Sequence, residues 1–89
     1  FEPMELEELR KVIDAIDTQM VALFIKRMET AFQIAACKKK QGLPVFIPER
    51  EAIVLEKVVS QACPDMQDYI RQLYMLIFEI SKDYQNKQT

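Results

Sequence analysis

An apolar stripe of helical spacing runs through the first forty residues, and it limits the possible folds more than any other feature. Neither glycine nor proline interrupts residues 4–41, and apolar side chains recur there in alternating steps of three and four. This near-heptad spacing predicts one helix over 4–41. A helix of about 36 residues would be roughly 54 Å long, whereas a compact domain of this size has a radius of gyration of about 12 Å. We therefore expect the helix to extend beyond its own domain, so that a second copy covers its stripe. The stripe consists of Leu6, Leu9, Ile13, Ile16, Met20 and Leu23.

Two shorter helices are expected after this one. Gly42 and Pro44 are typical of a helix end, and Pro48 suits the first position of a second helix over 48–62. Cys63-Pro64 ends that helix, and Asp65 with Asp68 resembles a capping arrangement for a third helix over 65–86. The inward residues expected are Ile53, Val54, Val58 and Val59 on the second helix, and Tyr69 or Ile70, Leu73, Ile77, Ile80 and Tyr84 on the third. We predict an all-α fold with a single domain over residues 1–89.

Size and charge exclude several classes of protein. At 89 residues the chain is near the length at which one hydrophobic core barely suffices and oligomerisation often helps. A net charge of −2 and a pI near 5.1 argue against nucleic-acid binding. The one basic run, residues 38–40, falls where cations complement a helix C-terminus. No apolar run reaches the ~20 residues of a membrane span. We expect a cytoplasmic protein. Phe1 at the start suggests trimming, a vector remnant or excision from a longer protein.

The types of residue that are missing exclude several chemistries. The sequence has no His and two distant cysteines, Cys37 and Cys63, so neither a disulfide framework nor a metal site of the usual N/S type is expected. Ser-His and Cys-His nucleophilic catalysis are excluded for the same reason. No glycine-rich loop could cradle phosphates. An enzyme built from this chain would act by positioning and electrostatics, which suits a unimolecular reaction of a small polyanion.

Two cations continue the apolar stripe and indicate an anion site. Arg27 and Lys38 are eleven residues apart, which places them on nearly the same helical face about 16 Å apart along the axis. Their long side chains can hold one small anion between them. The alternative is that an acid such as Glu51 pairs with them, since buried charge without a partner is costly.

Arg10 is too far along the same helix to join this site. It is about 25 Å from Arg27 and turned roughly 100° to one side, so it could act only in a partner's site. The simpler alternative is a surface ion pair with Asp14, four residues later. If Arg10 acts in a partner's site, the sequence predicts a small-anion site built across a dimer.

Four further polar residues on the later helices are candidates for a site. Glu51 suits the N-terminus of the second helix, where carboxylates are favoured. Arg50 in the same turn does not, so we expect it to serve a ligand or a partner. Ser81 and Gln85 are four residues apart and share one face of the third helix, beside its apolar stripe. The pattern alone favours the interpretation that these two are simple hydrogen-bonding residues between the helices of a dimer.

Four segments together resemble the all-helical class of chorismate mutase over essentially the whole chain. They read LEELRKVIDAID at 6–17, LFIKRMETAFQIAACKK at 23–39, LPVFIPEREAIVLE at 43–56 and IFEISKDYQ at 77–85. No single segment is specific, but their order and spacing are. The resemblance implies three helices intertwined as a homodimer, and a Claisen-type rearrangement of chorismate to prephenate without a cofactor.

The resemblance also implies a role for each candidate residue. Arg27 and the partner's Arg10 match arginines that hold the substrate carboxylates, with Ser81 assisting. Lys38 and Gln85 match the pair that donates hydrogen bonds to the ether oxygen. The remaining matches are Glu51, which receives the ring hydroxyl, and Arg50, which shapes the site beside it.

One position departs from the family's pattern. Many relatives have Asp where this chain has Ile47. An Asp would cap the second helix, so its loss should cost about 1 kcal/mol. A substrate contact through the backbone N–H at this position could survive the change, whereas a contact through the carboxylate could not.

Two alternative functions fit the same pattern. One is an isochorismate pyruvate lyase on the same fold, which Glu51 argues against because a carboxylate there binds the hydroxyl of the mutase substrate. The other is a non-catalytic helical dimerisation or regulatory module. Such a module needs the apolar stripes but not Arg27, Lys38 and Gln85 together.

Overall fold

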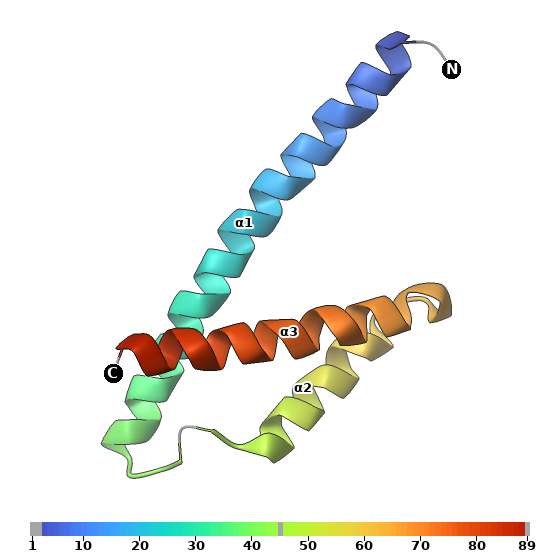
Figure 1. The fold of residues 1–89 in the computed structure, drawn as a ribbon. Helices are drawn as coiled ribbons and strands as arrows, with labels where there is room; N and C mark the ends of the chain where they lie inside the picture. Colours follow the sequence, from blue (N-terminus) through green and yellow to red (C-terminus); the bar gives the residue numbers. More distant parts are fainter. Residues whose placement is uncertain (1–2, 45, 89) are drawn as a thin grey trace. The chain divides into compact units, whose positions relative to one another are not determined.

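The computed structural model describes residues 3–44 and 46–88, and these residues form three helices. In Figure 1 they follow one another as α1 (Pro3–Lys40), α2 (Pro48–Ser60) and α3 (Pro64–Gln88). The predicted all-α class is confirmed. The observed helix ends differ from the expected bounds by at most two residues. Among the described residues, none of the helices is long and apolar enough to cross a membrane.

The chain divides into two compact units, Phe1–Thr30 and Ala31–Thr89, and α1 contributes residues to both. In the first unit, every side chain from Glu5 to Lys26 is exposed. The apolar stripe is exposed with them, from 39% at Leu6 to 66% at Leu23. A soluble chain rarely leaves so long an apolar surface uncovered.

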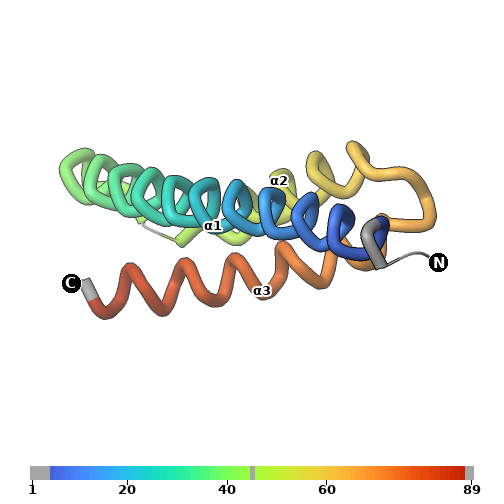
Figure 2. The backbone as a smooth tube through the Cα atoms, turned by 90° about the horizontal axis from the view of Figure 1, so that it is seen from above, coloured from blue at the N-terminus to red at the C-terminus, as the bar shows by residue number. Residues whose placement is uncertain are grey.

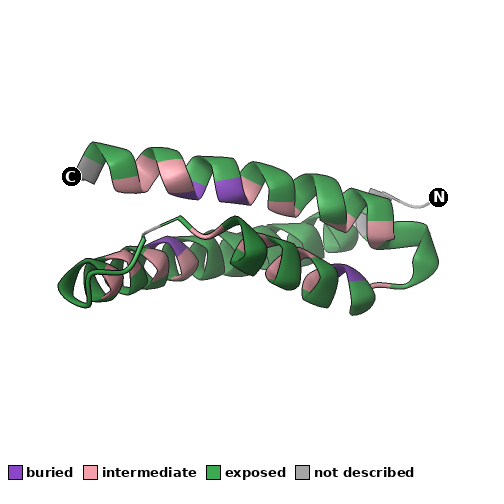
Figure 3. Ribbon diagram, turned by 90° about the horizontal axis from the view of Figure 1, so that it is seen from below, coloured by how far each residue is buried: buried purple, intermediate pink, exposed green. Residues whose placement is uncertain are grey.

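In the second unit, α2 and α3 run antiparallel and pack against each other, joined by a short turn (Figures 1 and 2). Val59 of α2 and Phe78 of α3 are buried. Figure 3 shows that buried positions, in purple, make up only a small part of the ribbon. Aromatic edge contacts join Tyr74 to Phe78, with ring centroids 6.1 Å apart, and Phe32 of α1 to Tyr84, at 6.4 Å. The core of this unit is therefore small and lies where the helices meet.

The inward face of α3 differs from the predicted apolar stripe. Phe78 and Ser81 are buried and Ile77 is half-buried, whereas Leu73 and Ile80 of the predicted stripe are exposed. On α2, Val59 is buried and Val54 and Val58 are half-buried as expected, but Ile53 is 57% exposed. The sequence prediction could not separate these faces, because α3 carries apolar residues on more than one side.

Local hydrogen bonds explain where the helices end. After α1, the Leu43 N–H donates to the Lys38 carbonyl at 2.9 Å and the Gly42 N–H to the Lys39 carbonyl at 3.2 Å. This is a Schellman motif, and Gly42 adopts the left-handed φ of +73° that the motif requires. At the start of α3, the Met66 N–H donates to the Cys63 carbonyl at 2.9 Å. Asp68 does not contribute to capping there, because its carboxylate pairs with Arg71 at 2.7 Å.

Candidate active site

Ser81 and Gln85 lie on the face that α3 turns inward within its own unit. Ser81 is 7% exposed, and among the residues that the structure describes it is the one polar side chain classed as buried. Gln85, one turn later, is half-buried. A buried polar side chain on an otherwise apolar face costs free energy unless it forms hydrogen bonds. The two residues share a face as predicted, although that face is the inward one and not a face beside it.

Glu51 is held by a lysine that the sequence analysis did not select. The Lys82 Nζ lies 3.5 Å from the Glu51 Oε2, joining α3 to the first turn of α2. The same ammonium lies 4.3 Å from the centre of the Phe46 ring, in the loop before α2. Long-range pairing of this kind has no local signal in the sequence, since 31 positions separate Glu51 from Lys82.

Ile47 is the N-cap residue of α2 and forms no side-chain cap hydrogen bond. Its backbone is extended, with φ −126° and ψ 102°, and Pro48 follows at the first helical position. The Ile47 carbonyl accepts hydrogen bonds from the N–H groups of Arg50 at 3.0 Å and Glu51 at 3.4 Å. Ile47 is half-buried and Arg50 is exposed. The backbone alone therefore sets the start of the helix that carries Glu51.

Lys38 lies in the last turn of α1, where the Schellman motif ends the helix. It is half-buried, whereas its neighbours Lys39 and Lys40 are exposed. This difference agrees with the interpretation of Lys39 and Lys40 as cations at a helix C-terminus, and it separates Lys38 from them.

Arg27 and Arg10 belong to the unit Phe1–Thr30. Arg27 is half-buried and Arg10 is exposed. The ion pair between Arg10 and Asp14 is not present in the described part of α1, and the Asp14 carbonyl accepts a hydrogen bond from the Thr18 hydroxyl at 3.0 Å. The alternative interpretation pairs Glu51 with Arg27 or Lys38. In the structure, the Glu51 carboxylate pairs with Lys82.

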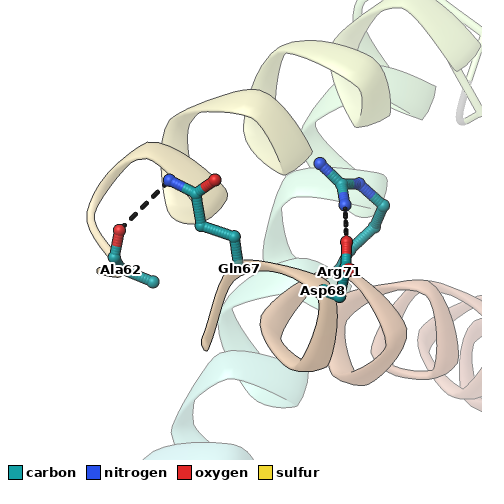
Figure 4. Close-up of polar contacts among 4 residues, drawn as sticks. All are labelled: Ala62, Gln67, Asp68 and Arg71. Atoms are coloured by element: carbon teal, nitrogen blue, oxygen red, sulfur yellow. Dashed lines mark hydrogen bonds and ion pairs between the residues drawn. The ribbon is translucent and has the colours of Figure 1, made fainter. Parts of the chain in front are cut away.

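A hollow of about 370 Å³ between α2 and α3 contains none of the predicted site residues. Two of its lining residues, Gln67 and Arg71, form polar contacts with the turn before α3 and within α3, as Figure 4 shows. The Gln67 Nε2 donates to the Ala62 carbonyl at 3.2 Å, and Arg71 pairs with Asp68. We interpret this hollow as the seam between two packed helices. No group of three metal-ligating side chains occurs among the residues that the structure describes.

The described residues thus define a small all-α protein whose candidate residues Glu51, Ser81 and Gln85 come from α2 and α3. The family model for type II chorismate mutase matches residues 9–86. The chain therefore belongs to the chorismate mutase type II family.

Known relatives match the chain over part of their own length. It is 44% identical over 55 residues to the bifunctional chorismate mutase/prephenate dehydratase of Aquifex aeolicus, covering 62% of this chain and 15% of that protein. The chain is 35% identical over 85 residues to the bifunctional chorismate mutase/prephenate dehydratase of Buchnera aphidicola, and the match covers 93% of this chain and 22% of that protein. The chain is 35% identical over 54 residues to the chorismate mutase of Methanocaldococcus jannaschii, and the match covers 61% of this chain and 54% of that protein. No solved structure matches the chain at a significant level.

Proposed function

We propose that this chain catalyses the rearrangement of chorismate to prephenate, without a cofactor, as a homodimer. The observation that carries the proposal is the family match over residues 9–86. This stretch includes all eight candidate residues, from Arg10 to Gln85. The chain spans about half or less of the length of the relatives it matches. A cytoplasmic location stays a prediction.

The proposed carboxylate-binding groups are arginines from two subunits. Arg27 of one subunit and the partner's Arg10 hold the two carboxylates of the substrate, and Ser81 assists them. Arginine suits this role because its planar guanidinium binds a carboxylate through two parallel hydrogen bonds. Holding both carboxylates selects the folded conformer of a flexible dianion, which lowers the entropic part of the barrier.

Lys38 and Gln85 form the proposed electrostatic centre. As the ether C–O bond breaks, negative charge grows on the departing oxygen. Donors already aimed at that oxygen stabilise the transition state more than the ground state, by roughly 3–4 kcal/mol for one donor. Both side chains are half-buried, so water competes less for their hydrogen bonds than it would at the surface.

The start of α2 supplies the proposed contacts to the substrate ring. Glu51 receives the ring hydroxyl, and Arg50 shapes the site beside it. The backbone N–H of Ile47 is the proposed donor to the substrate at this position, since the hydrogen bonds of Ile47 with other described residues use its carbonyl. The apolar side chain of Ile47 removes the carboxylate contact that an Asp would offer.

The exposed stripe of α1 supports the proposed dimer. Between Leu6 and Leu23 its side chains are 39% to 66% exposed, and burying a single Leu or Ile is worth about 1.5–3 kcal/mol. A second copy that covers this stripe would also bring its own Arg10 along.

Loss of chorismate absorbance, measured with the purified protein and with Lys38→Ala, tests the proposal. We expect the wild type to form prephenate and Lys38→Ala to be slower by ~100-fold or more. Lys39→Ala is the matched control, because Lys39 is an exposed neighbour in the same turn; its rate should stay within about twofold of wild type, as for other surface changes. A folded wild type that consumes no chorismate above the uncatalysed rate would overturn the proposal.

A further inference from the structure

Lys82 joins three parts of the second unit through two contacts. Its Nζ lies 3.5 Å from the Glu51 Oε2 and 4.3 Å from the centre of the Phe46 ring. Phe46 precedes Ile47, the N-cap residue of α2, and Glu51 lies in the first turn of that helix. One ammonium on α3 therefore holds both the entry loop and the first turn of α2.

The surroundings of this pair distinguish it from ordinary surface ion pairs. The Lys82 and Glu51 side chains are 41% and 29% exposed, whereas those of Lys87 and Asp83, paired at 3.1 Å within α3, are 73% and 66% exposed. The Lys87 pair joins residues one helical turn apart, so it adds little to tertiary structure. The Lys82 pair instead fixes the position of a side chain on a different helix.

Glu51 needs such a partner if it is to contact an anionic substrate. An unpaired carboxylate beside a dicarboxylate would be repelled by it, and it could rotate away from the ring hydroxyl. Lys82 contacts Oε2, and a carboxylate has enough lone pairs to accept another hydrogen bond through Oε1. The lysine therefore offsets the local negative charge and leaves an acceptor in place.

We propose that Lys82 is a positioning residue that orients Glu51 to receive the ring hydroxyl of the substrate. This inference rests on the proposed function, in which Glu51 has that role. The hydroxyl takes no part in the bonds that break or form, so its hydrogen bond contributes equally to the ground state and the transition state. Weakening a uniform interaction of this kind raises KM and leaves kcat unchanged.

The test compares Lys82→Met and Lys82→Arg with wild type, using chorismate as substrate. We expect Lys82→Met to raise KM about tenfold with kcat within about twofold, and Lys82→Arg to restore most of the loss because it keeps the cation. Lys87→Met is the matched control, since it removes the other lysine ion pair of α3, and its KM should equal that of wild type. Equal KM values for Lys82→Met and Lys87→Met would overturn the proposal.

Two further measurements separate positioning from other roles. In a Glu51→Gln background, Lys82→Met should raise KM by no more than about twofold, because the side chain it positions has already lost its charge. With an analogue whose ring hydroxyl is methylated, wild type and Lys82→Met should have similar KM values. Equal losses with chorismate and with the analogue would mean that Lys82 contacts the substrate itself, which contradicts the proposal.

Failure of the proposed function gives a different pattern. If the wild type forms no prephenate, the mutase assignment falls, and the role of Lys82 falls with it. If the wild type is active and Lys82→Met has an unchanged KM, the mutase assignment stands and only the positioning role is lost. Circular dichroism of each variant verifies folding, and Lys82→Arg keeps the test valid should Lys82→Met be unstable.

Discussion

At the scale of single residues, Gln85 determines how the proposed site responds to pH. Its neutral amide can donate to the ether oxygen at any pH, so we expect kcat to be flat across roughly neutral pH. Gln85→Glu can donate only when the new carboxyl is protonated, and a glutamic acid ordinarily has a pKa of about 4.3. The rate of this variant should therefore rise as pH falls, by up to about tenfold per unit.

The pH–rate profile of kcat for both proteins checks this prediction. Gln85→Ala is the control, because it lacks a donor at every pH and should be slow throughout. A wild type active only in acid, or a Gln85→Glu variant with a flat profile, would show that Gln85 does not donate to the reacting oxygen.

The candidate site residues come from the sequence and stay predictions, whereas the contact between Lys82 and Glu51 could not be predicted from it. Arg27 and Lys38 stood out because they interrupt an apolar stripe of one helix, which is a local signal. Lys82 carried no such signal. Its partners, Glu51 and Phe46, lie on other elements, and such pairing depends on how α3 faces α2. The face that α3 buries differs from the one expected from the spacing of its apolar residues.

At the scale of the helical element, the start of α2 can be strengthened. Ile47 occupies the N-cap position in an extended conformation and has no side-chain cap hydrogen bond. We predict that Ile47→Asp unfolds with a free energy about 1 kcal/mol higher than Ile47→Ala, since Asp can accept a hydrogen bond from an N–H group of the first turn. Comparison with Ala removes the cost of losing the half-buried isoleucine side chain.

Urea denaturation of the two variants at matched protein concentration measures this difference. Ile47→Asn, an uncharged cap, should match Asp in stability and thereby separate capping from charge. If Ile47→Asp is no more stable than Ile47→Ala, the start of α2 does not gain from a side-chain cap.

Helix ends were easier to predict than helix faces, for a physical reason. Gly42 and Pro48 act through their own backbone geometry: a left-handed φ ends α1, and a proline suits the first turn of α2. The face that a helix buries depends instead on its neighbours. Leu73 and Ile80 therefore remain exposed on α3 although their spacing suggested a buried stripe.

At the scale of the whole molecule, the exposed stripe of α1 predicts that folding and activity depend on association. Ile13 is 56% exposed, and Ile13→Glu should weaken the proposed dimer by on the order of 3 kcal/mol or more, because both copies of the change fall in one interface. That corresponds to a dissociation constant raised ~100-fold or more. Sedimentation equilibrium measures this change directly.

Thr18→Glu is the matched control for this substitution. Thr18 is exposed on the side of α1 opposite the stripe, and its hydroxyl bonds only to the Asp14 carbonyl within the helix. The Thr18→Glu substitution adds the same charge as Ile13→Glu, but outside the proposed interface. Equal dissociation constants for the two variants would mean that the stripe is not the dimer contact.

Mixing two inactive variants provides the sharpest test of a site shared between subunits. Arg10→Ala and Lys38→Ala should each be nearly inactive alone, because every site of either homodimer lacks one group. In a heterodimer, one site receives Lys38 from the first chain and Arg10 from the second and is intact, while the other site lacks both. After unfolding and refolding in equal amounts, random pairing makes half of the dimers heterodimers, so activity should recover to about a quarter of wild type. A mixture no more active than its components would show that Arg10 acts within its own subunit or not at all, and the site would then have to be rebuilt from Arg27 and the residues of α2 and α3.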